Sequence, residues 1–430
     1  MTPELLAELI KTHKQEVATK HDKQKKLYES DHEILHQIDK DEYKPDNRLV
    51  ANFAKYNVDT FNGYFMGIPV KVTHDDETVA KYLEFIDKYN GMDDHHSELS
   101  KMCDIYGKGY ELLFMDEYSN IGITISEVAE TFVVYDESIL RRPMYGMRYY
   151  KDTDNIERGS FSSVNTITYF YRGDTGYIFE DPTAHYFGDV PIIEYVENKE
   201  QHSLCDDVET LINAHNKALS EKANDVDYFA DAYLKMLGAD FDAAAIQKLR
   251  DSRTINLSGS GAEKIVVDFL QKPSSDETQE HLIERLERLI FQISMVANIN
   301  DESFGTSSGI SLKYKLQSMS NMASSKERKF TAGMNKRYKM ISNVPVPKQG
   351  LTGDDWMGIE YTFTRNVPNN LTEEVEAAAK MAGVTSKKTQ LSVISKIDDV
   401  DAEIRRIQEE QDEASGGVFN RAGDNDDDEE

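Results

Sequence analysis

Apolar residues recur at helical spacing in two stretches near the start of the chain. The first runs from Leu5 to Val17 and follows Thr2-Pro3, a capping residue and a proline that suits the first turn of a helix. The second follows Pro45-Asp46-Asn47, continues to Phe65 and ends at Gly67. The pattern therefore predicts that residues 1–70 are mostly helical.

Between residues 110 and 196 the pattern changes to short runs of β-branched and aromatic residues. Clusters of Gly, Asp, Asn and Ser separate these runs, as is typical of strands joined by turns. Strands are expected at 110–114, 121–125, 132–135, 145–150, 166–171 and 192–195. Together with the preceding helices they indicate an antiparallel sheet with helices packed on it, which is the α+β fold class.

Helical periodicity returns at residue 204 and predicts three long helices. The first spans 204–238. The second begins with the capping box at Ser274, and its apolar residues predict a narrow seam against another helix. That seam comprises Leu282, Leu286, Leu289, Ile293 and Val296. The third helix spans 309–341, and residues 239–273 are expected to form a compact insert with a short helix, a Ser-Gly turn and a strand near 265–267.

After residue 341 the elements become shorter. A strand is expected at 358–364, followed by three short helices that begin near residues 372, 386 and 400. The last segment, 423–430, holds six acidic residues and no apolar side chain. That composition predicts a disordered tail.

Composition narrows the class of protein. The 430 residues include 78 Asp and Glu but only 49 Lys and Arg, giving a net charge of −29, while 39% are hydrophobic. A sizeable core is possible, so global disorder is excluded. No stretch approaches the roughly 18 apolar residues of a membrane helix, and the N-terminus lacks the pattern of a secretory signal. We expect no membrane contact and no export, and the two cysteines fit a reducing compartment.

One enzymatic motif occurs in the sequence. His32, Glu33 and His36 match H-E-x-x-H, in which two histidines on one helix face hold zinc and the glutamate acts as a base. A zinc metallopeptidase is therefore an alternative function. The many flanking acids and Pro45 favour a solvated helix end instead. His95-His96 is expected in a polar cap or loop. No P-loop or nucleophile elbow is present, so neither an enzyme nor a cofactor is predicted.

The helix predicted at 309–341 differs in charge from the rest of the chain. It carries eight basic residues and one acid in a chain that is otherwise acidic. Possible basic contacts to DNA are Lys313, Lys315, Lys326, Arg328 and Lys329. Because this helix lacks interleaved aromatic residues, we expect its charges to face acidic neighbours rather than phosphates.

Three segments, in this order, resemble the portal proteins of long-tailed bacteriophages. The first runs from Asn47 to Val70, and the second from Pro191-Ile192-Ile193-Glu194-Tyr195 through Asn216 and Ser220 to Asn224-Asp225. The third is Asp301-Glu302-Ser303-Phe304-Gly305 through Lys315, followed by Lys326 to Phe330. The resemblance covers about residues 45–345, and its specificity lies in the order of the three blocks.

The resemblance implies a dodecameric ring at one capsid vertex, with a channel for packaging and ejecting double-stranded DNA. The wing would comprise 1–203 and 309–365, the stem helices 204–238 and 274–298, the clip 239–273, and the helical crown 366–422. The tunnel loop, 299–308, would present to DNA the residues Asn300, Asp301, Glu302, Ser303, Phe304, Gly305, Thr306, Ser307 and Ser308.

The implied partners are further copies of this chain, the terminase large subunit, a head-tail adaptor, and the major capsid and scaffolding proteins. The ring would assemble in the host cytoplasm and remain in the virion. Acidic stem helices would repel the DNA backbone and reduce its affinity for the channel wall. An acidic oligomeric scaffold or adaptor without a pore is a further alternative.

Overall fold

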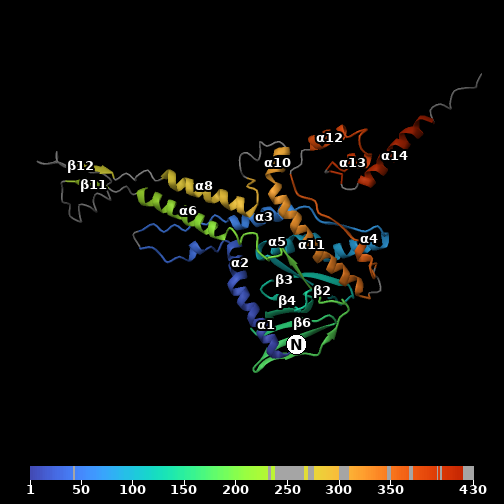
Figure 1. Ribbon diagram of the computed structural model, residues 1–430, viewed down its shortest axis with the longest axis horizontal. Coiled ribbons are helices and arrows are strands. Elements are labelled where there is room, and N and C mark those ends of the chain that lie inside the picture. Colours follow the sequence, from blue (N-terminus) through green and yellow to red (C-terminus); the bar gives the residue numbers. More distant parts are fainter. Residues whose placement is uncertain are drawn as a thin grey trace, which may run out of the picture. The chain divides into compact units, whose positions relative to one another are not determined.

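The computed structural model describes residues 1–41, 44–230, 234–237, 266–269, 276–299, 309–345, 350–367, 371–394, 396–397 and 400–419 (Figure 1). They belong to two compact units, residues 1–299 with 316–365, and residues 300–315 with 366–430. The short helix and Ser-Gly turn expected within the 239–273 insert, the tunnel loop from residue 300 onward and the acidic tail lie outside the described residues.

The first unit begins with the predicted helices. Thr2 caps α1, its hydroxyl accepting a hydrogen bond from the Leu5 amide, with Pro3 in the first turn. Leu6 and Ile10 of α1 enter the core of the larger sheet. Asn52 caps α3, which therefore starts later than the apolar pattern suggested. The helices are α1 (Pro3–Glu16), α2 (Asp22–Tyr28), α3 (Phe53–Met66), α4 (Glu77–Asn90) and α5 (Met92–Tyr106).

The strands form two main antiparallel sheets, whereas the sequence suggested one. The three-stranded sheet has the order β10 (Ile192–Val196), β2 (Lys108–Met115), β3 (Ile121–Ser126). The larger sheet contains β4 (Thr131–Tyr135), β5 (Pro143–Lys151), β6 (Glu157–Ser162), β7 (Thr166–Gly173), β8 (Gly176–Phe179) and β9 (Thr183–Ala184). All six expected strands are confirmed; β6, β8 and β9 were not expected.

The long helix α11 (Gln317–Asn343) lies across β10. Their close approach depends on Gly333, because a Cβ there would lie 2.3 Å from the Tyr195 ring. The sequence predicted one helix over 309–341, but the helix is interrupted at Leu316, before which α10 (Gly309–Lys315) belongs to the second unit. A small sheet pairs β1 (Lys71–Thr73) with β13 (Glu360–Thr362), shorter than the strand expected at 358–364.

Two helices of the first unit run side by side, α6 (Glu209–Ala230) and α8 (Asp276–Ser294) (Figure 1). The helix expected to reach residue 238 ends earlier, because 234–237 form β11, which pairs with β12 (Val266–Phe269). The predicted seam of α8 is also partly wrong. Leu286 is buried, but Leu282 is 50% and Ile293 43% exposed, and Ile290 is buried in their place.

The described part of the second unit is helical. Besides α10 it contains α12 (Leu371–Lys380), α13 (Lys387–Leu391) and α14 (Val400–Phe419), so the three expected helices are present, and α14 is the longest of them. Lys388 of α13 pairs with Asp401 of α14 at 2.8 Å. Across the described chain, no helix combines the length and apolar character needed to cross a bilayer.

Candidate functional site

An extended segment, which we call the strap (residues 44–52), lies along α6 (Figure 1). It brings the first portal-like sequence segment, which begins at Asn47, into contact with the second, which includes Asn216 to Asn224. Three alternate strap amides donate hydrogen bonds to three side chains spaced four residues apart on the helix. The pairs are Asn47 N to Asn224 Oδ1 at 2.6 Å, Leu49 N to Ser220 Oγ at 2.9 Å and Ala51 N to Asn216 Oδ1 at 2.9 Å. The resemblance to portal proteins at these positions thus corresponds to one physical contact.

Charged and polar side chains extend the contact of the strap region with α6. Asn47 also donates from Nδ2 to Asp227, and Lys40, just before the strap, pairs with Glu221 at 2.8 Å. Asn216, Ser220 and Asn224 are buried, whereas the strap is half-buried or exposed. Helix α6 is therefore attached to the strap region through polar groups.

Aromatic rings hold the base of the α6–α8 pair against α3. Phe53 meets His215 of α6 and Phe291 of α8 at ring-centroid distances of 4.9 and 5.6 Å, and Tyr56 meets Phe291 at 5.5 Å. Farther along, Gln279 donates to Asp225 at 3.0 Å. α8 carries five carboxylates and two arginines, so its exposed surface is acidic, as the sequence indicated.

Beneath α11 lies a fully buried ion pair. The guanidinium of Arg337 donates to both carboxylate oxygens of Glu111 on β2 and, at 2.8 Å, to His96 Nε2; His95 Nε2 lies 2.8 Å from Glu111 Oε2. Burial alone would raise the pKa of Glu111, but Arg337 and the hydrogen bond from His95 outweigh it and hold that pKa well below its usual range. Burial, with Arg337, lowers the pKa of His96, which stays neutral and accepts.

A second buried cluster lies on the same face of α11. Lys326 Nζ is 2.6 Å from Asp104 Oδ1 on α5 and 2.8 Å from Glu197 Oε2 just after β10. Its ammonium also lies over the rings of Phe61 and Phe65. One cation thus faces two buried carboxylates, and burial, reinforced by Glu197, raises the pKa of Asp104 well above its usual range despite the opposing effect of Lys326. Asp104 therefore holds its proton to higher pH than an ordinary aspartate does.

These clusters correct two sequence predictions. Lys326, one of the possible DNA contacts, is 1% exposed and is paired with acidic side chains of its own subunit. His95 and His96 are buried in α5 rather than placed in a polar cap or loop. The other possible basic contacts, Lys313, Lys315, Arg328 and Lys329, have exposed side chains.

The H-E-x-x-H motif does not form a metal site. Residues 33–36 form one turn of 3₁₀ helix, where three residues complete a turn, so His32 and His36 do not share a face. His32 is buried, not solvated as expected; its Nε2 donates to Leu27 O at 3.0 Å and its Nδ1 accepts from Asn216 at 2.9 Å. Both ring nitrogens are thus engaged. Among the described residues, no group of three or more His, Cys, Asp or Glu is arranged to hold a metal ion.

A family model and two individual relatives identify the same family of proteins. A family model described as "Phage portal protein, SPP1 Gp6-like" matches residues 7–417. The portal protein of Bacillus phage SPP1 is 25% identical over 419 residues, covering 90% of this chain and 81% of the relative. The portal protein of Clostridium phage phiCD119 is 23% identical over 397 residues, covering 86% of each chain.

A solved structure titled "Neck of empty GTA particle computed with C6 symmetry" has a chain with some likeness to this one. The TM-score is 0.43 at 11% identity, over 79% of this chain and 89% of that chain.

Proposed function

Because the chain belongs to the SPP1 Gp6-like family of phage portal proteins, we propose that twelve copies form a ring at one capsid vertex and enclose the channel through which double-stranded DNA enters and leaves. The observation that carries the proposal is the family match over residues 7–417. Portal proteins are structural components of the virion, and in our proposal a separate ATPase, the terminase large subunit, supplies the work of packaging.

The division of the chain into parts is also proposed. Residues 1–203 and 309–365 form the wing, 204–238 and 274–298 the stem, 239–273 the clip and 366–422 the crown. The paired helices α6 and α8, joined through the β11–β12 pair, support a stem that leads to a clip. The clip would meet the terminase and later the head-tail adaptor, and the wing the capsid and scaffolding proteins.

Acidic stem helices suit a channel for DNA. Each Lys or Arg that contacts a phosphate releases counterions and strengthens binding, which would hold the genome in place. A wall rich in carboxylates, such as α8, avoids that attachment. The exposed basic residues Lys313, Lys315, Arg328 and Lys329 are proposed as contacts to acidic neighbours or to DNA.

Electron microscopy of the purified protein tests the proposal directly. We expect a single species of about a dozen subunits with a central hole. A monomer at micromolar concentration would contradict the ring, and an oligomer without a hole would favour the acidic scaffold or adaptor.

The tunnel loop is tested separately. Deleting 303–308 should impair DNA packaging or retention while rings still form, because the loop is proposed to contact DNA rather than to join subunits. Replacing the same six residues by a Gly-Ser linker of equal length is the matched control for spacing. Loss of the ring in the deletion would show that the loop is structural.

A further inference from the structure

The turn between β4 and β5, residues 136–142, presents apolar side chains to solvent. Ile139 is 100% exposed and Leu140 is 65% exposed. Arg141 and Arg142, next in sequence, are exposed as well. We call this loop the basic tip. Exposed apolar side chains next to charge are typical of surfaces that bind another protein.

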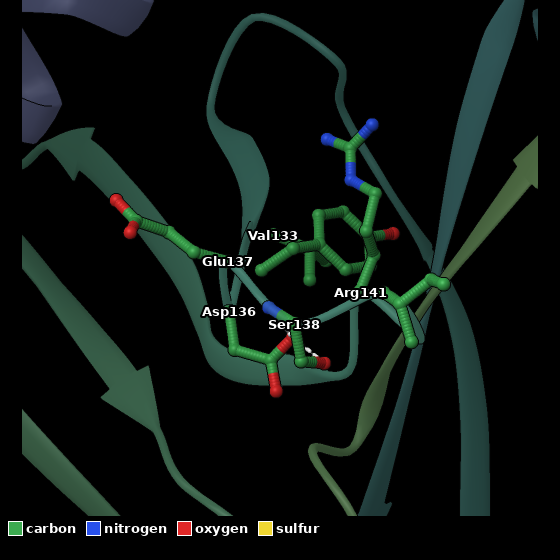
Figure 2. Close-up of a pocket in the computed structure, with 7 residues that line it drawn as sticks. Val133, Asp136, Glu137, Ser138 and Arg141 are labelled. Atoms are coloured by element: carbon green, nitrogen blue, oxygen red, sulfur yellow. Dashed lines mark hydrogen bonds between the residues drawn. The ribbon is translucent and has the colours of Figure 1, made fainter.

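The basic tip has a defined conformation. The carboxylate of Asp136 accepts hydrogen bonds from the Arg142 amide at 2.9 Å and the Ser138 hydroxyl at 2.7 Å, and the Arg141 amide donates to Ser138 O at 3.0 Å. In Figure 2, Asp136 turns toward Ser138, whereas Glu137 and Arg141 point away from each other. Because the loop is already ordered, docking it costs little conformational entropy.

A surface hollow of about 540 Å³ lies within this loop. Val133 (Figure 2), Tyr135 and Ile139 supply its apolar lining. Arg141 lies over the Tyr135 ring, 5.7 Å from its centroid. The hollow offers space for one protruding side chain of a partner.

A surface of complementary character lies on α4 and the β2–β3 turn, and we call it the acidic aromatic face. Phe85 and Tyr89 stack at 5.4 Å and are 43% and 44% exposed, and Tyr118 is 75% exposed. Tyr89 donates to Asp116, and Glu117 is exposed beside Tyr118. Asp116 fixes this turn as Asp136 fixes the basic tip, accepting from the amides of residues 118 and 120 at 2.9 and 2.7 Å.

The two surfaces lie at opposite edges of the three-stranded sheet. Tyr135, at the base of the basic tip, donates from its hydroxyl to Glu194 of β10 at 2.7 Å. Asn90, at the end of α4, accepts from Ile123 N of β3 at 2.8 Å. Since β10 and β3 are the two edge strands with β2 between them, the two surfaces lie toward different edges of this sheet. Two different, complementary patches on opposite sides of a subunit are what a closed ring requires.

We propose that the basic tip of one copy of this chain docks on the acidic aromatic face of the next copy. The adjacent copy's Tyr118 enters the hollow, Ile139 and Leu140 pack on the Phe85–Tyr89 stack, and the two arginines meet Asp116 and Glu117. Arginine suits both carboxylates and aromatic faces. A second copy is favoured over other partners because a chain of net charge −29 supplies the acidic surface that the arginines need. The inference rests on the proposed ring.

Cross-linking tests the contact. Cysteines introduced as Ile139→Cys and Tyr118→Cys in one chain, treated with a short bis-maleimide, should give covalent multimers up to the full ring. Each single variant should give none, because each lacks one of the two attachment points. The native Cys103 and Cys205 are buried, and burial raises the pKa of both thiols, so they react slowly. A matched control pairs Tyr118→Cys with Thr153→Cys on the exposed β5–β6 turn, which should stay uncross-linked.

Charged substitutions in the basic tip test the contact in a second way, through ring assembly. Ile139→Asp, and separately the double change Arg141→Glu and Arg142→Glu, should weaken ring assembly by about tenfold or more while subunits stay folded, since these side chains lie outside the core. If the variants form rings as well as the parent protein, or if Ile139→Cys cross-links to a capsid or scaffolding protein, the proposed contact is wrong. If the unmodified protein forms no ring, the proposed function itself fails instead.

Discussion

The underside of α11 and the strap on α6 show two different ways of joining distant segments. Under α11, Arg337 and Lys326 lie in dry surroundings opposite buried carboxylates. On α6, the strap is held by neutral amide and hydroxyl groups and is itself partly exposed. Buried charges make a contact costly to break, whereas neutral hydrogen bonds near water are replaced at small cost. We therefore expect the strap to open more readily than the contacts under α11.

The largest effect is expected for Arg337→Met. It leaves the Glu111 carboxylate buried without its cation, which should reduce the free energy of unfolding by about 3–5 kcal/mol. Urea or thermal unfolding measures the loss. Lys336→Met, on the exposed face of the same helix, should change it by less than about 0.5 kcal/mol. An equal effect of both changes would show that the buried ion pair contributes no more to stability than an exposed charge on the same helix.

The stability contributed by the buried cluster around Lys326 should have its own dependence on pH. Asp104 has a raised pKa, so the folded state retains its proton, and the associated stability is present at acidic pH and lost as pH rises above about 4 through the folded pKa. Glu111 has a lowered pKa, and its contribution is lost only as pH falls below about 4.5.

Asp104→Asn separates these contributions. Between pH 5 and 8 the unmodified protein should lose more stability than the variant, because the variant lacks the carboxyl that releases its proton on unfolding. Asp87, whose pKa burial raises to about 6, remains in both proteins, so its contribution cancels in the comparison. Parallel curves of unfolding free energy against pH would contradict the raised pKa of Asp104.

A smaller and local effect is expected on α6. Asn216→Ala removes both the acceptor of the Ala51 amide and the donor to the buried His32 Nδ1, and should cost about 2 kcal/mol. Amide hydrogen exchange should accelerate at Leu49 and Ala51 with little change under α11. Lys217→Ala, at the exposed neighbouring position, is the matched control. Faster exchange throughout the first unit would show that the strap and the core open together.

The smallest effect is expected for Arg328→Gln and Lys329→Gln. Both side chains are exposed on the helix that buries Lys326 and Arg337. Their loss should change unfolding free energy by less than about 0.5 kcal/mol, since exposed charges are well solvated. Thermal unfolding of the double variant checks this. A larger loss would show that exposed charges on α11 also contribute to stability, as the buried charges do.

Periodicity predicted most elements because their apolar faces are continuous. The clear failure among the strands was β6, whose residues Glu157–Ser162 include one apolar side chain, Phe161. Its Gly159 lets the chain pass close to β5, since a Cβ there would lie 2.2 Å from Arg148 O. Such a strand is specified by its neighbours rather than by its own alternation.

Charge was harder to interpret than periodicity. The sequence alone does not separate the basic residues of α11, but Lys326 and Arg337 lie on the same helical face as Phe330, Met334 and Ile341, all buried. Their spacing relative to this apolar stripe was the signal that could have identified them as buried. Their partners, Asp104 and Glu111, precede them by more than 200 residues, and no local pattern connects such positions.

The hydrogen bonds between strap and helix have a length limit set by geometry. Two residues of extended chain advance about 6.6 Å, whereas four residues of α-helix advance about 6.0 Å. Each further pair therefore adds about 0.6 Å of mismatch, and after three pairs the offset approaches what a hydrogen bond tolerates. The spacing of the strap amides therefore matches the spacing of the helix side chains over one short stretch only. The strap consequently has one favoured register on α6, and a shift by a single residue would misalign every pair at once.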